Sequence, residues 1–137
     1  MSFKEMTFDA VPENAEAVIG FIKEELEAQG CGFAELMAIN VAVDEIFSNI
    51  AHYAYGGKIG TASVSVETDG DPLTARVTFT DEGIPFDPLS VPEPDPDLPP
   101  DEREIGGMGI QIVRKSMDSA EYVYREGKNI FSFTKRI

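Results

Sequence analysis

Cysteine, histidine and basic residues are all scarce in this 137-residue sequence, and each scarcity excludes a class of function. The single cysteine, Cys31, cannot form an intramolecular disulfide or a cysteine-rich zinc site. The single histidine, His52, makes a poor metal site alone, so we interpret it as a structural or cleft-edge residue. Only 11 residues are basic against 25 acidic ones, and the net charge of −14 repels phosphate backbones. Direct binding of DNA or RNA is therefore not expected.

Long apolar segments are also missing. No stretch approaches the roughly 18 apolar residues that a membrane span needs, and residues 1–10 carry charges. We therefore expect a cytoplasmic protein that does not enter a membrane. With 42% hydrophobic residues the chain has enough apolar mass for one core, but 137 residues are too few for two comfortable domains. A single domain over residues 1–137 is expected.

The hydrophobic pattern predicts strands and helices in a definite order. Alternating side chains predict strands at residues 3–8, 61–68, 73–80, 121–125 and 129–136. Helical spacing predicts helices between Pro12 and Gly30, over residues 33–54, and over residues 109–116. The residues expected in the core of the first strand and the long helix are Phe3, Met6, Phe8, Leu36, Met37, Val43, Phe47, Ile50 and Ala54. This order favours a two-layer α+β sandwich, with the helices on one face of a mixed, mostly antiparallel sheet.

One segment interrupts this regular order. Seven of the nine prolines lie between Pro85 and Pro100, and acidic residues crowd the same interval. Neither a helix nor a strand can persist there, because proline lacks the N–H donor that both need. Loops of this length inside a compact domain are usually functional lids or disordered segments.

A glycine-rich turn follows this loop. Gly106, Gly107 and Gly109 have no side chains, so the backbone there can approach a ligand closely. They also lie at the start of a helix, whose first N–H groups have no intrahelical partner and favour anions. The alternative is a flexible hinge for the preceding loop. Two common phosphate sites are excluded, because the sequence has neither a P-loop motif nor the third glycine of the dinucleotide fingerprint.

Two further segments carry polar residues at informative places. Glu45 and Asn49 are four residues apart on the long helix, so they share one face, where a carboxylate can act as a base and an amide oxygen can bind a hard cation. A solvated polar face is the alternative. Asp81 follows an apolar strand and precedes Gly83, where a carboxylate can accept a hydrogen bond from an exocyclic amine such as that of adenine. Its alternative is an ordinary Asp-x-Gly turn.

Taken together, the three segments resemble a known family. Residues 43–49 (Val-Asp-Glu-Ile-Phe-Ser-Asn), 81–88 (Asp-Glu-Gly-Ile-Pro-Phe-Asp-Pro) and 106–110 (Gly-Gly-Met-Gly-Ile) are similar to the three boxes of the anti-sigma factor serine/threonine kinases. These are small GHKL-type ATPase domains with the Bergerat-type ATP-binding fold. The resemblance covers nearly the whole chain, and the boxes occur in the family's order.

The resemblance implies a role for each matching residue. Asn49 would hold Mg²⁺, Glu45 would be the catalytic base, Asp81 would bind adenine, and Gly83 would give the base room. Residues 87–105 would be the ATP lid. The phosphates would be surrounded by the glycine turn, which consists of Gly106, Gly107, the backbone of Met108, and Gly109. The implied cofactors are ATP and Mg²⁺.

The chain also departs from the family pattern. Tyr53 stands where many relatives have a histidine, and Arg103 is the only basic residue of the lid. Arg103 is therefore the nearest candidate in the lid for a charge-assisted phosphate contact. On the last strand, the sequence leaves open whether Ser132 or Thr134 faces the nucleotide.

The leading hypothesis is an ATP-Mg²⁺-dependent serine protein kinase that phosphorylates a STAS-type anti-sigma antagonist and sequesters a sigma factor. The alternative is a non-catalytic ATP-binding switch of the same fold. Two further alternatives are a histidine-kinase catalytic domain and a plain acidic interaction module. The first fits poorly, because the sequence offers no upstream helical region with a histidine to phosphorylate. The resemblance also implies a homodimer.

Overall fold

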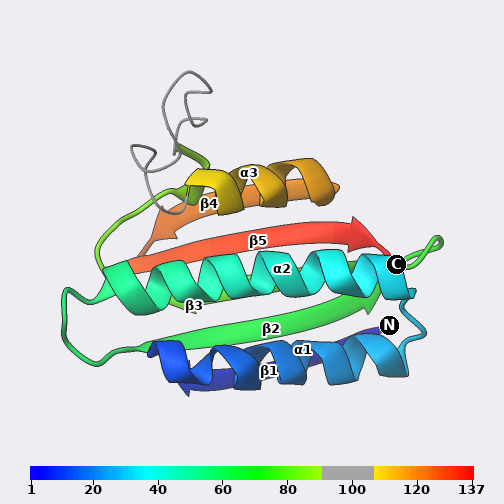
Figure 1. Ribbon diagram of the computed structural model, residues 1–137, viewed down its shortest axis with the longest axis horizontal. Coiled ribbons are helices and arrows are strands. Elements are labelled where there is room, and N and C mark those ends of the chain that lie inside the picture. The colour runs from blue at the N-terminus through cyan, green and yellow to red at the C-terminus, as the bar shows by residue number, and fades with distance from the viewer. Residues whose placement is uncertain (91–106) are drawn as a thin grey trace.

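The computed structural model describes residues 1–90 and 107–137, with side chains from residue 109 onward in the second segment. It is a two-layer α+β sandwich, in which three helices cover one face of a five-stranded sheet (Figure 1). The helices are α1 (Ala15–Ala28), α2 (Phe33–Asn49) and α3 (Gly107–Ser116). The strands are β1 (Ser2–Asp9), β2 (Thr61–Asp69), β3 (Thr74–Asp81), β4 (Ser119–Arg125) and β5 (Lys128–Arg136). The predicted fold class is therefore confirmed.

The strand order β1-β2-β3-β5-β4 places the last strand inside the sheet. Every pair of neighbouring strands among the described residues is antiparallel, so the sheet is more regular than the mixed sheet expected. The helix α2 runs along the middle of the helical layer, with α1 on one side and α3 on the other (Figure 1). This arrangement puts the end of α2 and the start of α3 close to the same end of the sheet.

The core lies between the two layers. Alternate positions of the inner strands point toward the helices, which gives β3 its strictly alternating pattern of buried and half-buried residues. The largest fully buried side chains come from all three helices and three of the strands: Phe47, Phe79, Phe133, Ile22, Leu26, Ile39, Ile46, Ile110, Val18, Val43, Val64 and Val66. The hydrophobic effect over this contiguous set holds the helices to the sheet.

Three residues predicted for the core are exposed instead. Phe3 is 61% exposed because it pairs with Glu67 on the sheet face opposite to that of Phe8. Met6 is 50% exposed on β1, which is an edge strand with a neighbour on one side only. Only Phe8 of that strand is buried. Met37 is 38% exposed on the outer face of α2, because it directly follows the buried Leu36 and successive helical residues point about 100° apart.

The edge strand is tied to α1 by an ion pair. Lys4 Nζ on β1 lies 3.1 Å from Glu25 Oε2 on α1, and the Glu25 side chain is almost completely buried. Its pKa is lowered from 4.5, chiefly by the hydrogen bond to Lys4, against an opposing effect of burial. Gln29 Nε2 also donates to Glu25 Oε1 at 3.3 Å. The buried carboxylate is therefore compensated.

The long helix predicted over residues 33–54 changes character directly after Asn49. The segment η2 (Ile50–Ala54) forms a wider π-helical turn. Such turns are rare and are found mostly at functional sites. No helix among the described residues is long and apolar enough to cross a membrane.

Candidate functional site

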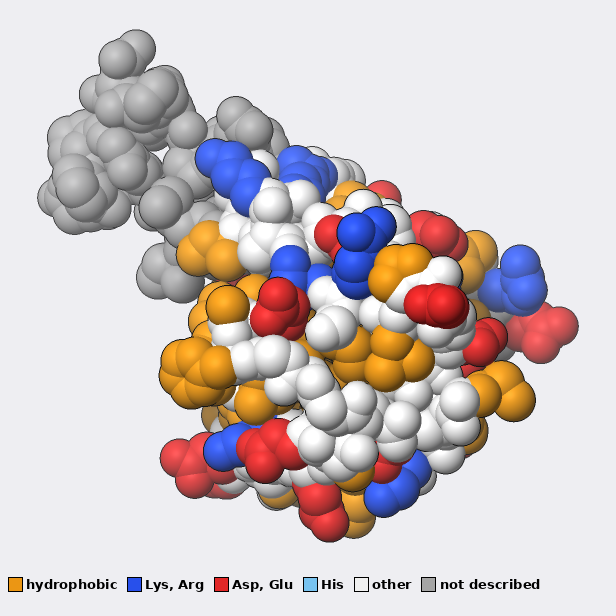
Figure 2. Space-filling view, turned by 90° about the vertical axis from the view of Figure 1, so that its right-hand side faces the viewer, with side chains coloured by type: hydrophobic (Ala, Val, Ile, Leu, Met, Phe, Trp, Pro, Cys, Tyr) orange, Lys and Arg blue, Asp and Glu red, His pale blue; other side chains and the backbone are white. Residues whose placement is uncertain are grey.

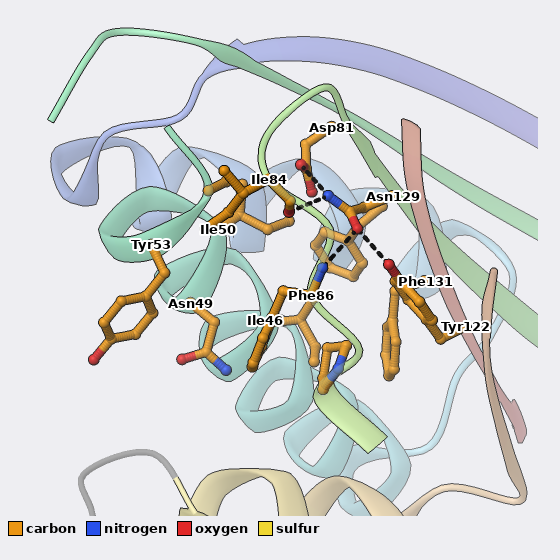
Figure 3. A pocket seen from close by; sticks show the side chains of 13 residues that line it. Ile46, Asn49, Ile50, Tyr53, Asp81, Ile84, Phe86, Tyr122, Asn129 and Phe131 are labelled. Carbon is orange, nitrogen blue, oxygen red and sulfur yellow. Dashed lines mark hydrogen bonds between the residues drawn. The ribbon is translucent and has the colours of Figure 1, made fainter. Parts of the chain in front are cut away.

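A cavity lies where the end of α2, β3, β5 and the loop after β3 meet (Figure 3). Most of its wall is apolar, and its polar groups come from a few side chains. The lining residues are Ile46, Asn49, Ile50, Tyr53, Ala54, Phe79, Asp81, Ile84, Phe86, Pro88, Tyr122, Asn129 and Phe131. An apolar hollow with few converging polar groups is the usual form of a small-molecule site.

Asp81 is the last residue of β3, where the strand reaches the cavity. It is only 6% exposed, and its Oδ1 accepts two hydrogen bonds, from Gly83 N at 2.9 Å and from Asn129 Nδ2 at 3.0 Å. Among the described residues, no hydrogen bond ends on Oδ2. The Asp-x-Gly turn expected as the alternative is thus present, and it leaves the second oxygen of the carboxylate available to a ligand.

Gly83 has a packing role that the sequence did not reveal. A Cβ at this position would overlap the carbonyl oxygen and side chain of Ala54, at the end of η2. The next residue, Ile84, donates its N–H to the same Ala54 oxygen at 2.9 Å. The missing side chain therefore lets the loop after β3 pack onto the end of α2, and the space that it frees is taken by protein.

Tyr55 supports the same loop from outside the cavity. Its hydroxyl donates to the Thr61 carbonyl and accepts the N–H of Glu82 at 2.9 Å. Its ring lies against Gly60, where a Cβ would overlap it. No sequence motif predicts this contact, because its partners are not adjacent in the chain.

Asn129 and Tyr122 are site residues that the sequence interpretation missed. Asn129 is 6% exposed and lies opposite Asp81 in the pairing of β3 with β5. Its Oδ1 accepts hydrogen bonds from the Tyr122 hydroxyl on β4 and from Phe86 N at 3.1 Å. Burial raises the pKa of Tyr122, so the hydroxyl stays protonated and can donate. The only available sequence signal was a polar residue at the start of a strand.

Glu45 and Asn49 share one face of α2, as predicted. Asn49 Nδ2 donates to Glu45 Oε1 at 3.3 Å. Burial raises the pKa of Glu45 from 4.5; the hydrogen bond from Asn49 opposes this shift, and the charge of Asp44 adds to it. A half-buried carboxylate with a raised pKa is a better proton acceptor than an exposed one.

The start of α3 lies against this pair. A Cβ at Gly109 would overlap the Glu45 carboxylate, so any other residue here would have to push that side chain aside. The glycine turn and the Glu45–Asn49 pair, 60 residues apart in the sequence, therefore form one site. Gly107 is the first residue of α3, whereas Gly106 and the side chain of Met108 lie outside the described residues.

The lid predicted over residues 87–105 is described only in its first part. Pro88–Ser90 form a short 3-10 turn, η3, in which Leu89 N donates to Asp87 Oδ1 at 2.8 Å. Pro88 is buried and lines the cavity, so the beginning of this segment is part of the wall. The rest, including Arg103, lies outside the described residues.

The polar groups fit a magnesium ion that is held mainly by a nucleotide. The described residues include no cluster of three or more histidine, cysteine, aspartate or glutamate side chains. Mg²⁺ commonly takes only one or two protein ligands and completes its shell with water and phosphate oxygens. Asn49 suits this use, because its amino group is engaged with Glu45 and its oxygen is left for another partner.

Histidine and tyrosine next to this pair have separate roles. His52 Nδ1 lies 2.7 Å from the Ser48 carbonyl, so this nitrogen carries the proton and the ring is bound to its own helix. The structural interpretation of His52 agrees with this contact. Tyr53 lines the cavity and is 53% exposed at its edge, across from Asn129 (Figure 3).

The two hydroxyl residues of β5 do not face the cavity. Ser132 Oγ accepts a hydrogen bond from Arg76 at 3.2 Å, and Thr134 Oγ1 lies 2.5 Å from Ser119 Oγ, both on the sheet face away from the helices. Asn129 and Phe131, which alternate with Ile130 along β5, reach the cavity instead. The sequence left open whether Ser132 or Thr134 faces the nucleotide, and in the structure neither side chain points into the cavity.

Comparisons with known proteins agree with this geometry. The family model of the histidine kinase-like ATPase domain matches residues 8–135. The RsbU and RsbW domains of Rv1364c from Mycobacterium tuberculosis have a similar fold, with a TM-score of 0.71 and 18% identity over 99% of this chain and 32% of that one. The SiaB–SiaC complex from Pseudomonas aeruginosa gives a TM-score of 0.59 and 17% identity over 96% and 89%.

A third similar structure is the histidine kinase AdeS from Acinetobacter baumannii, with a TM-score of 0.51 and 12% identity over 99% of this chain and 68% of that one. None of the curated proteins matches the sequence. The chain spans about a third of the length of the Mycobacterium protein. At these identities the solved structures show a common fold, and the family match over residues 8–135 is what assigns the chain. This protein belongs to the family of histidine kinase-like ATPase domains.

Proposed function

We propose that this protein is an ATP-Mg²⁺-dependent serine protein kinase of the anti-sigma type. It would transfer the γ-phosphoryl group of ATP to a serine of a STAS-type antagonist and, in another state, sequester a sigma factor. The observation that carries the proposal is that Glu45 contacts both Asn49 and Gly109. A base, a metal ligand and the start of a helix are thus adjacent, beside a cavity with a free carboxylate oxygen on Asp81.

Each residue has a task in this reaction. Asp81 accepts a hydrogen bond from the exocyclic amine of adenine, and Asn49 holds Mg²⁺ through its amide oxygen. The first N–H groups of α3 face the phosphates, which a helix N-terminus favours. Glu45 accepts the proton of the attacking serine hydroxyl, and its raised pKa suits this role. Bound Mg²⁺ supplies neutralisation of phosphate charge, and most of phosphoryl transfer is such positioning and neutralisation.

Labelled ATP provides a direct test. The purified protein is incubated with Mg²⁺, ATP labelled in the γ-phosphate, and candidate STAS-type antagonists from the same organism. We expect the label on a serine of the antagonist. If ATP binds but no label is transferred, the kinase proposal is wrong and the non-catalytic ATP switch becomes the better description.

The partner part of the proposal is supported by an exposed apolar surface. The outward residues of the first turns of α2 are Phe33, Met37 and Val41, which are 77%, 38% and 48% exposed. Hydrophobic side chains gather on the left-hand edge of the end-on view, below the grey segment (Figure 2). Contiguous exposed apolar side chains of this kind are typical of protein interaction sites.

Met37→Asp and Val41→Asp should therefore weaken binding of the antagonist while ATP binding stays as in the wild type. Ile59→Asp, which changes an apolar residue 80% exposed elsewhere, is the matched control. Calorimetric titration of both ligands measures the two effects. Sedimentation equilibrium of the same variants tests the predicted homodimer: a dimer unaffected by either α2 variant would place its interface on another surface.

A further inference from the structure

Asn129 is the most connected polar side chain of the cavity (Figure 3). Its Nδ2 donates to Asp81 Oδ1 at 3.0 Å and to the Ile84 carbonyl at 2.9 Å, with a longer contact of 3.4 Å to the Gly83 carbonyl. Its Oδ1 accepts from Phe86 N and from the Tyr122 hydroxyl. One buried amide thus joins β3, β4, β5 and the loop after β3.

These partners determine which way the amide points. The backbone N–H of Phe86 can only donate, so the oxygen of Asn129 must face it. The carbonyl of Ile84 can only accept, so the amino group must face that side. The flipped orientation would set acceptors against acceptors in a buried site, which is costly. Asn129 therefore always presents a donor to Asp81.

In Asp81, therefore, one of the two carboxylate oxygens is already engaged in hydrogen bonds within the protein. Oδ1 accepts from both Gly83 N and Asn129 Nδ2, and these two hydrogen bonds fix the rotation of the carboxylate. Its other oxygen then offers only acceptor lone pairs to the cavity. A ligand can pair with it only by donating a hydrogen.

Asn129 also holds the wall against which a flat ring would lie. Ile84 and Phe86 line the cavity, although their side chains are 61% and 41% exposed. Their backbones are held by the Asn129 amide, one on each side of it. Loss of this side chain would release both the carboxylate and the loop.

We propose that Asn129 is a positioning residue that makes the cavity selective for adenine over guanine. The inference rests on the proposed ATP binding and adds its base specificity. Adenine carries an exocyclic amino group, a donor, where guanine carries a carbonyl oxygen. In the same pose the guanine oxygen meets an acceptor-only carboxylate. Sites built on a buried hydrogen bond reject ligands that lack its partner strongly.

The test measures binding of three ligands, each with Mg²⁺: ATP, GTP and inorganic tripolyphosphate. For Asn129→Ala we expect ATP affinity to fall about 10- to 100-fold, the usual cost of a lost hydrogen bond to a charged group. The preference for ATP over GTP should fall with it. Tripolyphosphate has no base, so its affinity should not change.

Two further variants separate positioning from simple folding. Asn129→Asp keeps the shape of the side chain but places an acceptor against Asp81 and Ile84, so it should lose selectivity at least as strongly. Tyr122→Phe removes one donor to Asn129 and keeps the ring, and a smaller loss of selectivity is expected. The matched controls are Ser132→Ala, on the opposite face of β5, and Tyr124→Phe, on the exposed part of β4.

The outcomes distinguish the inference from the function on which it rests. Wild-type protein that binds no ATP contradicts both. Wild-type protein that binds ATP, with variants that keep its preference over GTP, contradicts only the inference. An equal loss of ATP and tripolyphosphate binding in Asn129→Ala and Tyr122→Phe would also overturn it, because the residue would then support the whole site instead of the base.

Discussion

At Glu45 two effects on one carboxylate oppose each other. Burial raises its pKa, while the hydrogen bond from Asn49 lowers it, and burial has the larger effect. The result is a carboxylate that is more basic than an ordinary glutamate. Its contact with Gly109 places it at the start of α3, where a transferred phosphoryl group is expected.

Glu45→Gln should therefore remove the base and keep the shape. We expect kinase turnover to fall about 10²- to 10⁴-fold, the usual contribution of general-base catalysis. Affinity for ATP should be unchanged, because the amide retains an oxygen for Asn49. Steady-state phosphorylation of the antagonist and calorimetry with ATP measure the two quantities. Glu24→Gln, which changes an exposed carboxylate on α1, should leave both as they are.

Asn49 is the second residue with a testable task. Its oxygen is the protein ligand proposed for Mg²⁺, so Asn49→Ala should abolish the gain in ATP affinity that Mg²⁺ gives to the wild type. Titrations of ATP with and without Mg²⁺ show this directly. Asn14→Ala, in a residue that bonds only to the Asp9 carbonyl at the start of the helical layer, is the control. A full Mg²⁺ effect in Asn49→Ala would remove Asn49 from the metal site.

At the level of elements, the contact between the loop after β3 and the end of α2 depends on a missing side chain. Gly83→Ala places a methyl group on the Ala54 backbone, which cannot move aside as a flexible side chain could. We expect the free energy of unfolding to fall by about 1–3 kcal/mol, as for other overpacked sites. ATP binding should weaken as well, because the loop carries Ile84 and Phe86.

Gly20→Ala is the matched control for this change. Gly20 lies within α1, and a Cβ there would meet nothing within 4 Å. Alanine in a helix interior is more favourable than glycine by about 0.5–1 kcal/mol, so this variant should be more stable than the wild type. Urea unfolding of both proteins gives the comparison. If Gly83→Ala and Gly20→Ala changed the free energy of unfolding by the same amount, the contact of residue 83 with Ala54 would carry no strain.

The helices and strands were largely predictable from the sequence, but which strands lie side by side in the sheet was not. Alternation in β2 and β3 and the apolar stripe of α2 are local patterns, so the sequence predicts them. The prediction of Phe3 and Met6 in the core is wrong: Phe3 lies on the other face of the strand from Phe8, and local alternation does not show that Met6 is on an edge strand. Asn129 was missed for the same reason: its role depends on β5 lying between β3 and β4.

The three boxes were found because each is a short motif, and their meeting in space follows from the family fold. Gly109 against Glu45 confirms that two of them are adjacent. The role of Gly83 was not predictable, since it depends on where the end of α2 lies. The π-helical turn after Asn49 likewise had no local signal in a segment whose residues all suit an ordinary helix.

For the whole molecule, the Lys4–Glu25 pair links stability to pH. The lowered pKa of Glu25 means that its contribution is present above the unfolded value near 4.5 and is lost as pH falls through the folded value. Lys4→Met leaves a buried carboxylate with fewer partners, so we expect a loss of about 1–3 kcal/mol at neutral pH. The loss should shrink in acid, where Glu25 is protonated in both proteins.

Thermal unfolding at neutral and acid pH measures this dependence. Lys23→Met is the control, because Lys23 and Glu27 form a 3.7 Å pair in which both side chains are exposed. Such surface pairs contribute about 0–1 kcal/mol. A pH dependence for Lys4→Met identical to that of the wild type would show that Glu25 does not depend on this partner.

The position of β5 inside the sheet has a consequence for biosynthesis. Of the five strands described it is the last to be synthesised, and until it inserts, β3 has an open hydrogen-bonding edge and Asp81 lacks its buried amide partner. An unfinished chain can therefore form its helices but not its base pocket, and its exposed strand edge favours aggregation. The proposed nucleotide site can therefore be completed only after β5 has paired with β3.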